Sequence, residues 1–374
     1  MAKCTGVPGL CPRSTSLWSP SDIKNYRPIS NFSFVLKVVE RIVVRQLLEY
    51  FTANSLLPKF QSGFRRHHST ESALLWVLSD IFSATDKGEV SLLALFDVSA
   101  AFDTVDHSIL LNRLSILYGI SGSAFDWMQS FIVGRTQTVH YGGSVSRRAQ
   151  LRSGIAQGSA LGPILYVLYT ADVHKLVQSF GFRVHLYADD TQFHDSCKST
   201  DAAVLAARAM RVIEAVKEWM SSNQLRLNAD KTQFIWLGTS HFLDVLQINH
   251  IPANEVVNNL GVYFDPELLM ERQVTKLCQV CYFHLRRLRT VRRSLTKESM
   301  LTLVNAFITS RVDRCNGGLS GSNGYVLGRL QSVLNSAAKL ILGFLSSTAF
   351  LPPPAMNFTG CRSTIFARVI INIK

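Results

Sequence analysis

The sequence predicts an α+β fold in which helices and antiparallel strands alternate irregularly. Residues 90–96 and 184–188 are short apolar segments bounded by turn-forming residues, the pattern of buried strands. Residues 35–51 and 205–220 repeat apolar side chains along one helical face. The chain has 374 residues, 47% of them hydrophobic, so it is long enough to bury a large core and to form several subdomains.

Two acidic stretches stand at the ends of the predicted strands. Asp97 follows the first strand, and Asp189 and Asp190 form the tight connection between the second strand and a hairpin partner. Acids are scarce in a chain with 39 Lys and Arg against 26 Asp and Glu, and a buried carboxylate is costly without a positive partner. Because neighbouring residues of a strand point to opposite faces, we expect Asp189 rather than Asp190 to share a site with Asp97.

A divalent cation is the natural partner for such a pair of carboxylates. Mg²⁺ binds one or two protein carboxylates, keeps several waters and takes its other oxygens from substrate phosphates. Either acidic stretch alone is more readily interpreted as a solvated turn, since turns tolerate Asp well. Taken together they predict two Mg²⁺ ions, with Mn²⁺ as an alternative, held by Asp97 and Asp189 for phosphoryl transfer.

Seven segments in a fixed order point to a known family. They are residues 25–30, 61–70, 96–103, 154–163, 187–190, 225–232 and 259–262. Their order resembles the successive blocks of reverse transcriptases and is most similar to that of non-LTR (LINE-type) retrotransposons, over residues 22–345. The resemblance implies a right-hand polymerase architecture with fingers, an antiparallel-sheet palm and a helical thumb. It also implies an RNA-directed DNA polymerase, a nucleotidyltransferase that adds dNTPs to a primer 3′-OH.

The resemblance implies roles for residues around the acidic stretches. Asp97 and Asp189 match the family's metal-binding aspartates, and Asp190 matches the second acid of its Tyr-x-Asp-Asp turn. Phe102 falls where the family has an aromatic beneath the incoming sugar, and there its ring would collide with a 2′-hydroxyl and select dNTPs. Lys231 corresponds to the lysine near the pyrophosphate leaving group, where a cation or proton donor lowers the barrier. The alternatives are a core aromatic for Phe102 and a solvated lysine before a strand at 233–237 for Lys231.

Other residues match positions that touch the substrates. Gln157 and Gly158 match residues that contact the template and the incoming nucleotide, and a glycine there permits close approach of the backbone. Arg65 and Arg66 are candidates for binding the triphosphate, because a planar guanidinium suits phosphate oxygens. The sequence does not decide between the two arginines.

Two further acids are assigned to structure rather than to catalysis. Asp103 and Asp106 stand at the start of a helix predicted over residues 104–117, where acids cap the helix and complement its dipole. A second helix is predicted to begin near Pro163, since proline is favoured in the first turn.

A basic, acid-free segment at residues 272–297 indicates a polymeric anion as substrate. The formal net charge of the chain is +13, and phosphate contacts of this kind supply affinity and register without reading sequence. A solvated helix or a localisation signal is the alternative. The segment predicts a thumb that grips a template-primer duplex, and Leu260 and Gly261 just before it resemble the turn that steadies the primer terminus. The arginines expected to bind nucleic acid are Arg286, Arg287, Arg289, Arg292 and Arg293.

These patterns divide the chain into four parts. Residues 1–21 are a poorly defined N-terminal segment, 22–265 the fingers and palm of the reverse transcriptase domain, 266–345 a helical thumb-like region and 346–374 an irregular tail. No Asp or Glu occurs from residue 314 onward, and relatives carry an upstream endonuclease domain that this sequence lacks. We therefore expect a truncated or decaying element.

The sequence leaves three functional hypotheses. The first is an active RNA-directed DNA polymerase, and the second is a catalytically inactive remnant of a retrotransposon polymerase that retains nucleic-acid binding. A metal-dependent nuclease or phosphatase also uses paired acids, but it would not require the block at Gln157 and Gly158 or the basic thumb, so we rank it last.

The expected partners are an RNA template, a DNA primer and dNTPs, with no membrane association and no separate protein partner indicated. Seven scattered cysteines favour a reducing compartment, and residues 1–20 have no apolar core of a secretory signal. Cys278 and Cys281 form a lone Cys-x-x-Cys without finger-like ligand spacing, so we assign them to structure. We expect an intracellular protein, with nuclear action implied by family analogy alone.

Overall fold

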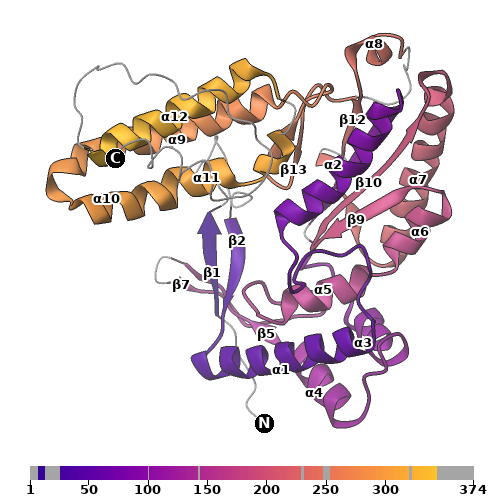
Figure 1. The fold of residues 1–374 in the computed structure, drawn as a ribbon. Helices are drawn as coiled ribbons and strands as arrows, with labels where there is room; N and C mark the ends of the chain where they lie inside the picture. Colours follow the sequence, from indigo (N-terminus) through magenta and orange to yellow (C-terminus); the bar gives the residue numbers. More distant parts are fainter. Residues whose placement is uncertain are drawn as a thin grey trace. The chain divides into compact units, whose positions relative to one another are not determined.

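The structure, a computed structural model, describes residues 7–12, 26–99, 101–141, 144–228, 231–246, 253–319 and 322–342. Helices and strands alternate irregularly along it, which confirms the predicted α+β class (Figure 1). The chain separates into two units. Unit 1 comprises Met1–Ser69, Ala94–Asp195 and Ala206–Thr232, and unit 2 comprises Thr70–Leu93, Ser196–Leu205 and Gln233–Lys374.

The largest sheet has four strands in the order β12-β3-β10-β9. These strands are β3 (Val90–Phe96), β9 (Arg183–Tyr187), β10 (Asp190–Cys197) and β12 (Gln233–Leu237). β9 and β10 pair antiparallel, with Asp190 opposite Tyr187 and His194 opposite Arg183. The strands predicted from the apolar segments therefore form, and β10 extends the predicted hairpin partner as far as Cys197. β3 is buried along almost its whole length, because its residues are apolar on both faces.

Two-stranded ladders complete the strands of unit 1. β1 (Val7–Pro12) pairs antiparallel with β2 (Tyr26–Asn31), and β4 (Val98–Ser99) pairs antiparallel with β11 (Arg226–Leu227). The remaining short ladders join β5 (Thr136–Gln137) to β8 (Ala149–Gln150) and β6 (His140–Tyr141) to β7 (Ser144–Val145). The β4–β11 ladder matters most for function, since it ties the residues after Asp97 to the segment before Lys231.

The helices of unit 1 begin with side chains or residue types suited to helix starts. They are α1 (Phe34–Ala53), α3 (His107–Ile116), α4 (Gly122–Ile132), α5 (Gly162–Thr170), α6 (Val173–Ser179) and, from residue 206, α7 (Ala202–Ser222). Asp106 caps α3, because its carboxylate accepts the Ile109 N–H at 2.9 Å. α5 carries Pro163 in its first turn as predicted and is almost completely buried.

One expectation about α3 is wrong. The helix begins at His107 rather than at residue 104, so Asp103 lies outside its first turn. Asp103 instead accepts two hydrogen bonds from Gln157, described below. The acid spacing that suggested a double cap has only one capping member, Asp106.

Unit 2 is mainly helical and contains one hairpin of its own. Its hairpin joins β13 (Val257–Asn259) to β14 (Val262–Phe264). Its helices are α2 (Thr70–Asp86), α8 (Ser240–Leu243), α9 (Glu271–Val291), α10 (Lys297–Val304), α11 (Ser310–Asp313) and α12 (Gly324–Leu342), with short 3-10 or π turns at Ser199–Asp201, Arg292–Ser294, Asn305–Thr309 and Asn316–Leu319. The predicted helical region after residue 265 is therefore present from α9 to α12.

α9 and α12 pack against each other through apolar faces (Figure 1). Cys278 and Cys281 lie on the buried face of α9, spaced three residues apart so that both point to the same side. Burial raises the pKa of both thiols, to about 11 for Cys281. Among the described residues, no group of three or more His, Cys, Asp or Glu is arranged to hold a metal ion. Both cysteines are buried residues of α9.

No helix of the described ranges has the length and hydropathy needed to cross a bilayer. The predicted boundaries at 21/22 and 345/346 lie outside the described residues, as does the tail at 346–374.

Candidate active site

The turn that carries Asp189 is short and backbone-strained. Only Ala188 and Asp189 connect β9 to β10, since Tyr187 and Asp190 pair with each other. Ala188 has φ of 57°, in the left-handed region that glycine prefers and that costs other residues about 1–2 kcal/mol. A strained turn persists only when its surroundings fix it.

The segment at residues 60–63 supplies that support. The Gln61 side-chain oxygen accepts hydrogen bonds from the Ala188 N–H at 3.0 Å and the Gly63 N–H at 2.7 Å. The Ser62 N–H donates to the Leu186 carbonyl and the Leu186 N–H donates to the Phe60 carbonyl, both at 2.9 Å. This segment therefore forms a parallel β-bridge to β9 and holds the turn at Ala188. Sequence reasoning did not find this role for Gln61, because its partner stands 127 residues away.

We expect Gly63→Ala to reduce primer extension by about 10²-fold, because a misplacement of about 1 Å at a reactive group has an effect of that size. A Cβ at Gly63 would lie 2.4 Å from the Ala188 nitrogen, so the turn must shift. Gly328→Ala is the control, since a Cβ there has no neighbour within 4 Å. Rates of extension by the two folded variants test this, and equal rates would contradict it.

Two histidines share the Ser62 hydroxyl behind the turn. Ser62 Oγ lies 2.9 Å from His185 Nε2 and 2.9 Å from His68 Nδ1. Burial, followed by the charges of His194 and His68, lowers the pKa of His185 to about 4. His185 is therefore neutral near pH 7.

Stability should fall in acid because of His185. Its folded-state pKa of about 4 lies below the ordinary value of 6.5, so its contribution is complete above pH 6.5 and is lost as the pH falls towards 4. The shift corresponds to a loss of up to about 3 kcal/mol in the free energy of unfolding. Urea unfolding of the wild type and His185→Gln at several pH values in that window measures it. Parallel pH dependences for the two proteins would rule out this contribution.

Asp97 is held by residues of the 225–232 segment. Its Oδ2 accepts hydrogen bonds from Lys231 Nζ at 2.9 Å and from Asn228 Nδ2 at 3.1 Å, and its carbonyl accepts the Asn228 N–H at 2.9 Å. Asn228 thus orients both the backbone and the carboxylate of Asp97. The role of Asn228 was not predicted, although Asn228 stands only three residues before Lys231, for which a role was predicted.

The three aspartates act on one another electrostatically. Asp190 is exposed as a residue, yet desolvation of its carboxyl and then the charges of Asp189 and Asp97 raise its pKa to about 6, with Lys231 acting in the opposite direction. The same three carboxylates, after burial, raise the pKa of Tyr166. The Tyr166 hydroxyl is fully buried without a hydrogen-bond partner. The turn therefore brings both Asp189 and Asp190 near Asp97. Strand alternation alone predicts that only one of the two lies on the side of Asp97.

Phe102 lies against Tyr166, and the segment around Gln157 is hydrogen-bonded to residues 102 and 103. Phe102 is half-buried, and its ring centroid lies 5.2 Å from that of Tyr166. The Phe102 carbonyl accepts the Ile155 N–H at 2.6 Å, and Gln157 Nε2 donates to both carboxylate oxygens of Asp103 at 3.1 and 3.2 Å. These hydrogen bonds join residues 102–103, which follow Asp97, to residues 155–157, which precede α5.

The other residues predicted to contact the substrates lie on separate segments of the chain. Arg65 donates to the Pro58 and Lys59 carbonyls at 3.3 and 3.2 Å, whereas Arg66 is exposed. Leu260 and Gly261 form the β13–β14 turn with φ of 48° and 85°, both positive as a two-residue hairpin turn of type I′ requires. This turn belongs to unit 2, and the three aspartates belong to unit 1.

The basic segment contains both exposed and engaged arginines. Arg286, Arg289 and Arg293 are exposed. Arg287 lies over the Phe283 ring at 5.6 Å. Arg292 donates to the carbonyls of Leu295, Leu340 and Ile341, so its guanidinium satisfies the end of α12. Nucleic-acid binding by these arginines stays a prediction, and Arg292 has a structural function in addition.

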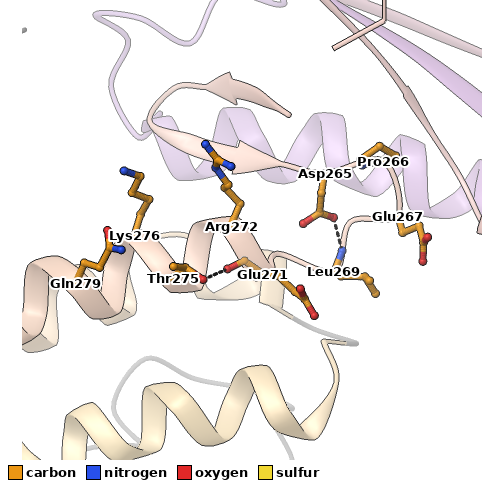
Figure 2. A pocket seen from close by; sticks show the side chains of 9 residues that line it. All are labelled: Asp265, Pro266, Glu267, Leu269, Glu271, Arg272, Thr275, Lys276 and Gln279. Carbon is orange, nitrogen blue, oxygen red and sulfur yellow. Dashed lines mark hydrogen bonds between the residues drawn. The ribbon is translucent and has the colours of Figure 1, made fainter. Parts of the chain in front are cut away.

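A pocket in unit 2 lies apart from the predicted catalytic residues along the chain. Figure 2 shows it at the start of α9, where the Asp265 carboxylate accepts the Leu269 N–H at 2.6 Å. It is lined by Asp265, Pro266, Glu267, Leu269, Glu271, Arg272, Thr275, Lys276 and Gln279. Its lining includes none of Asp97, Asp189 and Asp190.

The fold is that of the right-hand polymerases, as two of the solved structures similar to it illustrate. One is telomerase from Candida albicans in complex with the TWJ fragment of telomeric RNA (TM-score 0.53, 12% identity, 92% of this chain and 62% of that chain). The other is apo telomerase from Candida tropicalis (TM-score 0.50, 11% identity, 90% of this chain and 63% of that chain). At these identities the likeness is one of fold alone, and it confirms the predicted architecture.

The model of the reverse transcriptase (RNA-dependent DNA polymerase) family matches residues 18–264, and the chain belongs to this family. Residues 18–264 are therefore a reverse transcriptase domain. This confirms the family indicated by the ordered sequence blocks.

Curated relatives come from non-LTR retrotransposons. The RNA-directed DNA polymerase from mobile element jockey of Drosophila melanogaster is 29% identical over 269 residues, 70% of this chain and 29% of that protein. Its counterpart from Drosophila funebris is 30% identical over 267 residues, 69% of this chain and 29% of that protein. The probable RNA-directed DNA polymerase from transposon BS of Drosophila melanogaster is 26% identical over 292 residues, 75% of this chain and 31% of that protein. The chain thus spans less than a third of the length of these relatives.

Proposed function

We propose that this chain extends a DNA primer on an RNA template with dNTPs, by two-metal-ion phosphoryl transfer. The observation that carries the proposal is the electrostatic coupling of Asp190 with Asp189 and Asp97 in unit 1, with Lys231 on Asp97. Asp97 contacts Lys231, and burial, followed by the charges of Asp189 and Asp97, raises the pKa of Asp190 to about 6. Such a concentration of like charge is costly unless a cation shares it.

The donor atoms fit Mg²⁺. Asp97 and Asp189 would hold the ions through hard carboxylate oxygens, with substrate phosphates as further ligands, and Mn²⁺ accepts the same donors. The unpartnered, buried hydroxyl of Tyr166 lies in the field of the same carboxylates, which marks the site as built around a missing polar or charged group. When bound, the ions would supply activation of the primer hydroxyl and stabilisation of the leaving pyrophosphate.

Asn228 would orient Asp97, and Lys231 would stabilise the pyrophosphate leaving group. Asn228 fixes Asp97 by two hydrogen bonds, one to its carboxylate and one to its backbone carbonyl. Lys231 is 61% exposed in its side chain, so its amine is free to leave Asp97 and to donate to a pyrophosphate oxygen.

Phe102 would exclude ribonucleotides. Its ring is half-exposed and backed by the buried Tyr166 ring, so it has little room to retreat from a 2′-hydroxyl.

We expect Phe102→Ala to reduce the preference for dNTPs over rNTPs by about 10²-fold, because it removes the collision and leaves the acids unchanged. Phe131→Ala is the control, since that half-buried ring of α4 stacks on Trp127. Single-nucleotide incorporation with dNTP and rNTP measures the ratio. An unchanged ratio in Phe102→Ala would exclude the steric role.

The proposed polymer contacts are Gln157 and Gly158 for template and nucleotide, Arg65 or Arg66 for the triphosphate, and Leu260 and Gly261 for the primer. The exposed arginines of unit 2 would bind the duplex backbone, which makes binding salt-dependent.

The test is extension of a labelled DNA primer on an RNA template. Extension should stop when a chelator removes divalent ions and should return with Mg²⁺ or Mn²⁺. Folded protein that binds the duplex in a salt-sensitive manner without any extension would support the inactive remnant instead.

A further inference from the structure

A buried carboxylate lies behind the segment that carries Gln157 and Gly158. We call residues 155–161 the Gln157 loop; it leads directly into α5. Glu40, in the middle of α1, is 0% exposed. Its oxygens meet the Gln157 loop 119 and 120 residues further along the chain.

The contacts use both oxygens of Glu40. Oε1 accepts the Ser159 hydroxyl at 2.9 Å, and Oε2 accepts the Ala160 N–H at 2.8 Å. The Ser159 hydroxyl oxygen in turn accepts the N–H groups of Leu161 and Gly162 at 3.1 and 3.0 Å. Ser159 therefore satisfies the N–H groups of Leu161 and Gly162 at the start of α5, and Glu40 satisfies that of Ala160 just before it.

The other side of the Gln157 loop is fixed to β2. The Ser30 N–H donates to the Gln157 carbonyl at 2.8 Å. Gly158 has φ of 93°, and a Cβ there would lie 3.2 Å from the Ser30 carbonyl oxygen. The Gln157 loop is thus held between β2 on one side and the Glu40 carboxylate on the other.

We infer that Glu40 is a positioning residue that holds the Gln157 loop in the conformation that receives template and incoming nucleotide. This rests on the proposed function, which assigns those ligands to Gln157 and Gly158. Glu40 itself touches no substrate, since it is fully buried.

The geometry requires a carboxylate rather than an amide. The Ala160 N–H is a fixed donor, and the Ser159 oxygen already accepts two N–H groups, so its hydrogen points to Glu40. A glutamine would turn its NH₂ group towards one of these donors. Glu40→Gln, an isosteric change, should therefore release the loop almost as fully as removal of the side chain.

The experiment compares Glu40→Gln with Leu47→Ala, a change at another buried position of α1. Steady-state primer extension gives KM and kcat for dNTP, and amide hydrogen exchange follows the loop in the protein without substrates. We expect Glu40→Gln to raise KM about tenfold with kcat changed by less than about threefold. Exchange at residues 159–162 should become about tenfold faster than in Leu47→Ala.

Equal KM and equal exchange in Glu40→Gln and the wild type would overturn the inference, as would the same changes in Leu47→Ala. If Glu40→Gln does not fold, Ser159→Ala replaces it, because that variant keeps the Glu40–Ala160 hydrogen bond and loses only the hydroxyl. If the wild type shows no extension, the proposed function fails. The exchange measurement then still decides whether Glu40 anchors the loop.

Discussion

Asp189→Asn should lower primer extension by at least about 10³-fold while the chain remains folded. Asparagine has the size of aspartate but lacks its charge, so the substitution removes a ligand from the proposed metal site without opening a cavity. The turn should keep its shape, since the hydrogen bonds of Gln61 are made to the backbone of Ala188 rather than to Asp189. Single-turnover extension at saturating Mg²⁺ measures the loss.

Asp106→Asn is the matched control for this substitution. It removes a carboxylate from the same unit, and asparagine caps a helix as well as aspartate does, so α3 should be unaffected. An Asp189→Asn protein that extends primers within about tenfold of the Asp106→Asn protein would remove Asp189 from the chemistry.

Lys231→Met should lower the rate of nucleotide transfer by about 10²-fold, the size expected for loss of a general acid or of a cation at the leaving group. Folding should be little affected, because the Lys231 side chain is 61% exposed, against 26% for Asp97, and ion pairs open to solvent on one side contribute only about 1 kcal/mol. The pre-steady-state rate at saturating dNTP is the relevant measurement.

Two further variants separate the explanations for Lys231. Lys217→Met changes a lysine of the same unit with the same 61% side-chain exposure and a single acidic partner, Glu214, so it controls for the loss of one surface charge. Lys231→Arg keeps the positive charge but gives up its proton far less readily. Full activity of Lys231→Arg would assign an electrostatic role, and a Lys231→Met rate equal to that of Lys217→Met would exclude both roles.

Local patterns were sufficient to predict the elements of the palm. The apolar segments at 90–96 and 184–188 form strands, because runs of that length between turn residues have no alternative way to be buried. The amphipathic segment at 35–51 forms α1, with ends displaced by one or two residues. The position of Asp189 in the hairpin connection was predicted in the same way, because one strand ends just before the connection and the next begins just after it.

The residues that hold the predicted catalytic side chains in place could not be predicted from local patterns. Gln61 binds the turn at Ala188, and Asn228 binds Asp97 over 131 residues, so neither contact has a local signature. Asp103 was misassigned because acid spacing near a helix start is a short-range signal, whereas its partner Gln157 lies 54 residues away. Such contacts depend on tertiary packing, which overrides local preference.

The rate at which the buried thiols of α9 are alkylated should measure how often unit 2 opens. A thiol whose pKa is raised to about 11, as at Cys281, is almost entirely protonated near neutral pH, and this one is buried where α9 packs on the other helices of unit 2. An alkylating reagent should therefore modify it only when this helical packing opens. The rate of labelling would report how often this packing opens, and its slowing by template-primer duplex would connect nucleic-acid binding with the rigidity of unit 2.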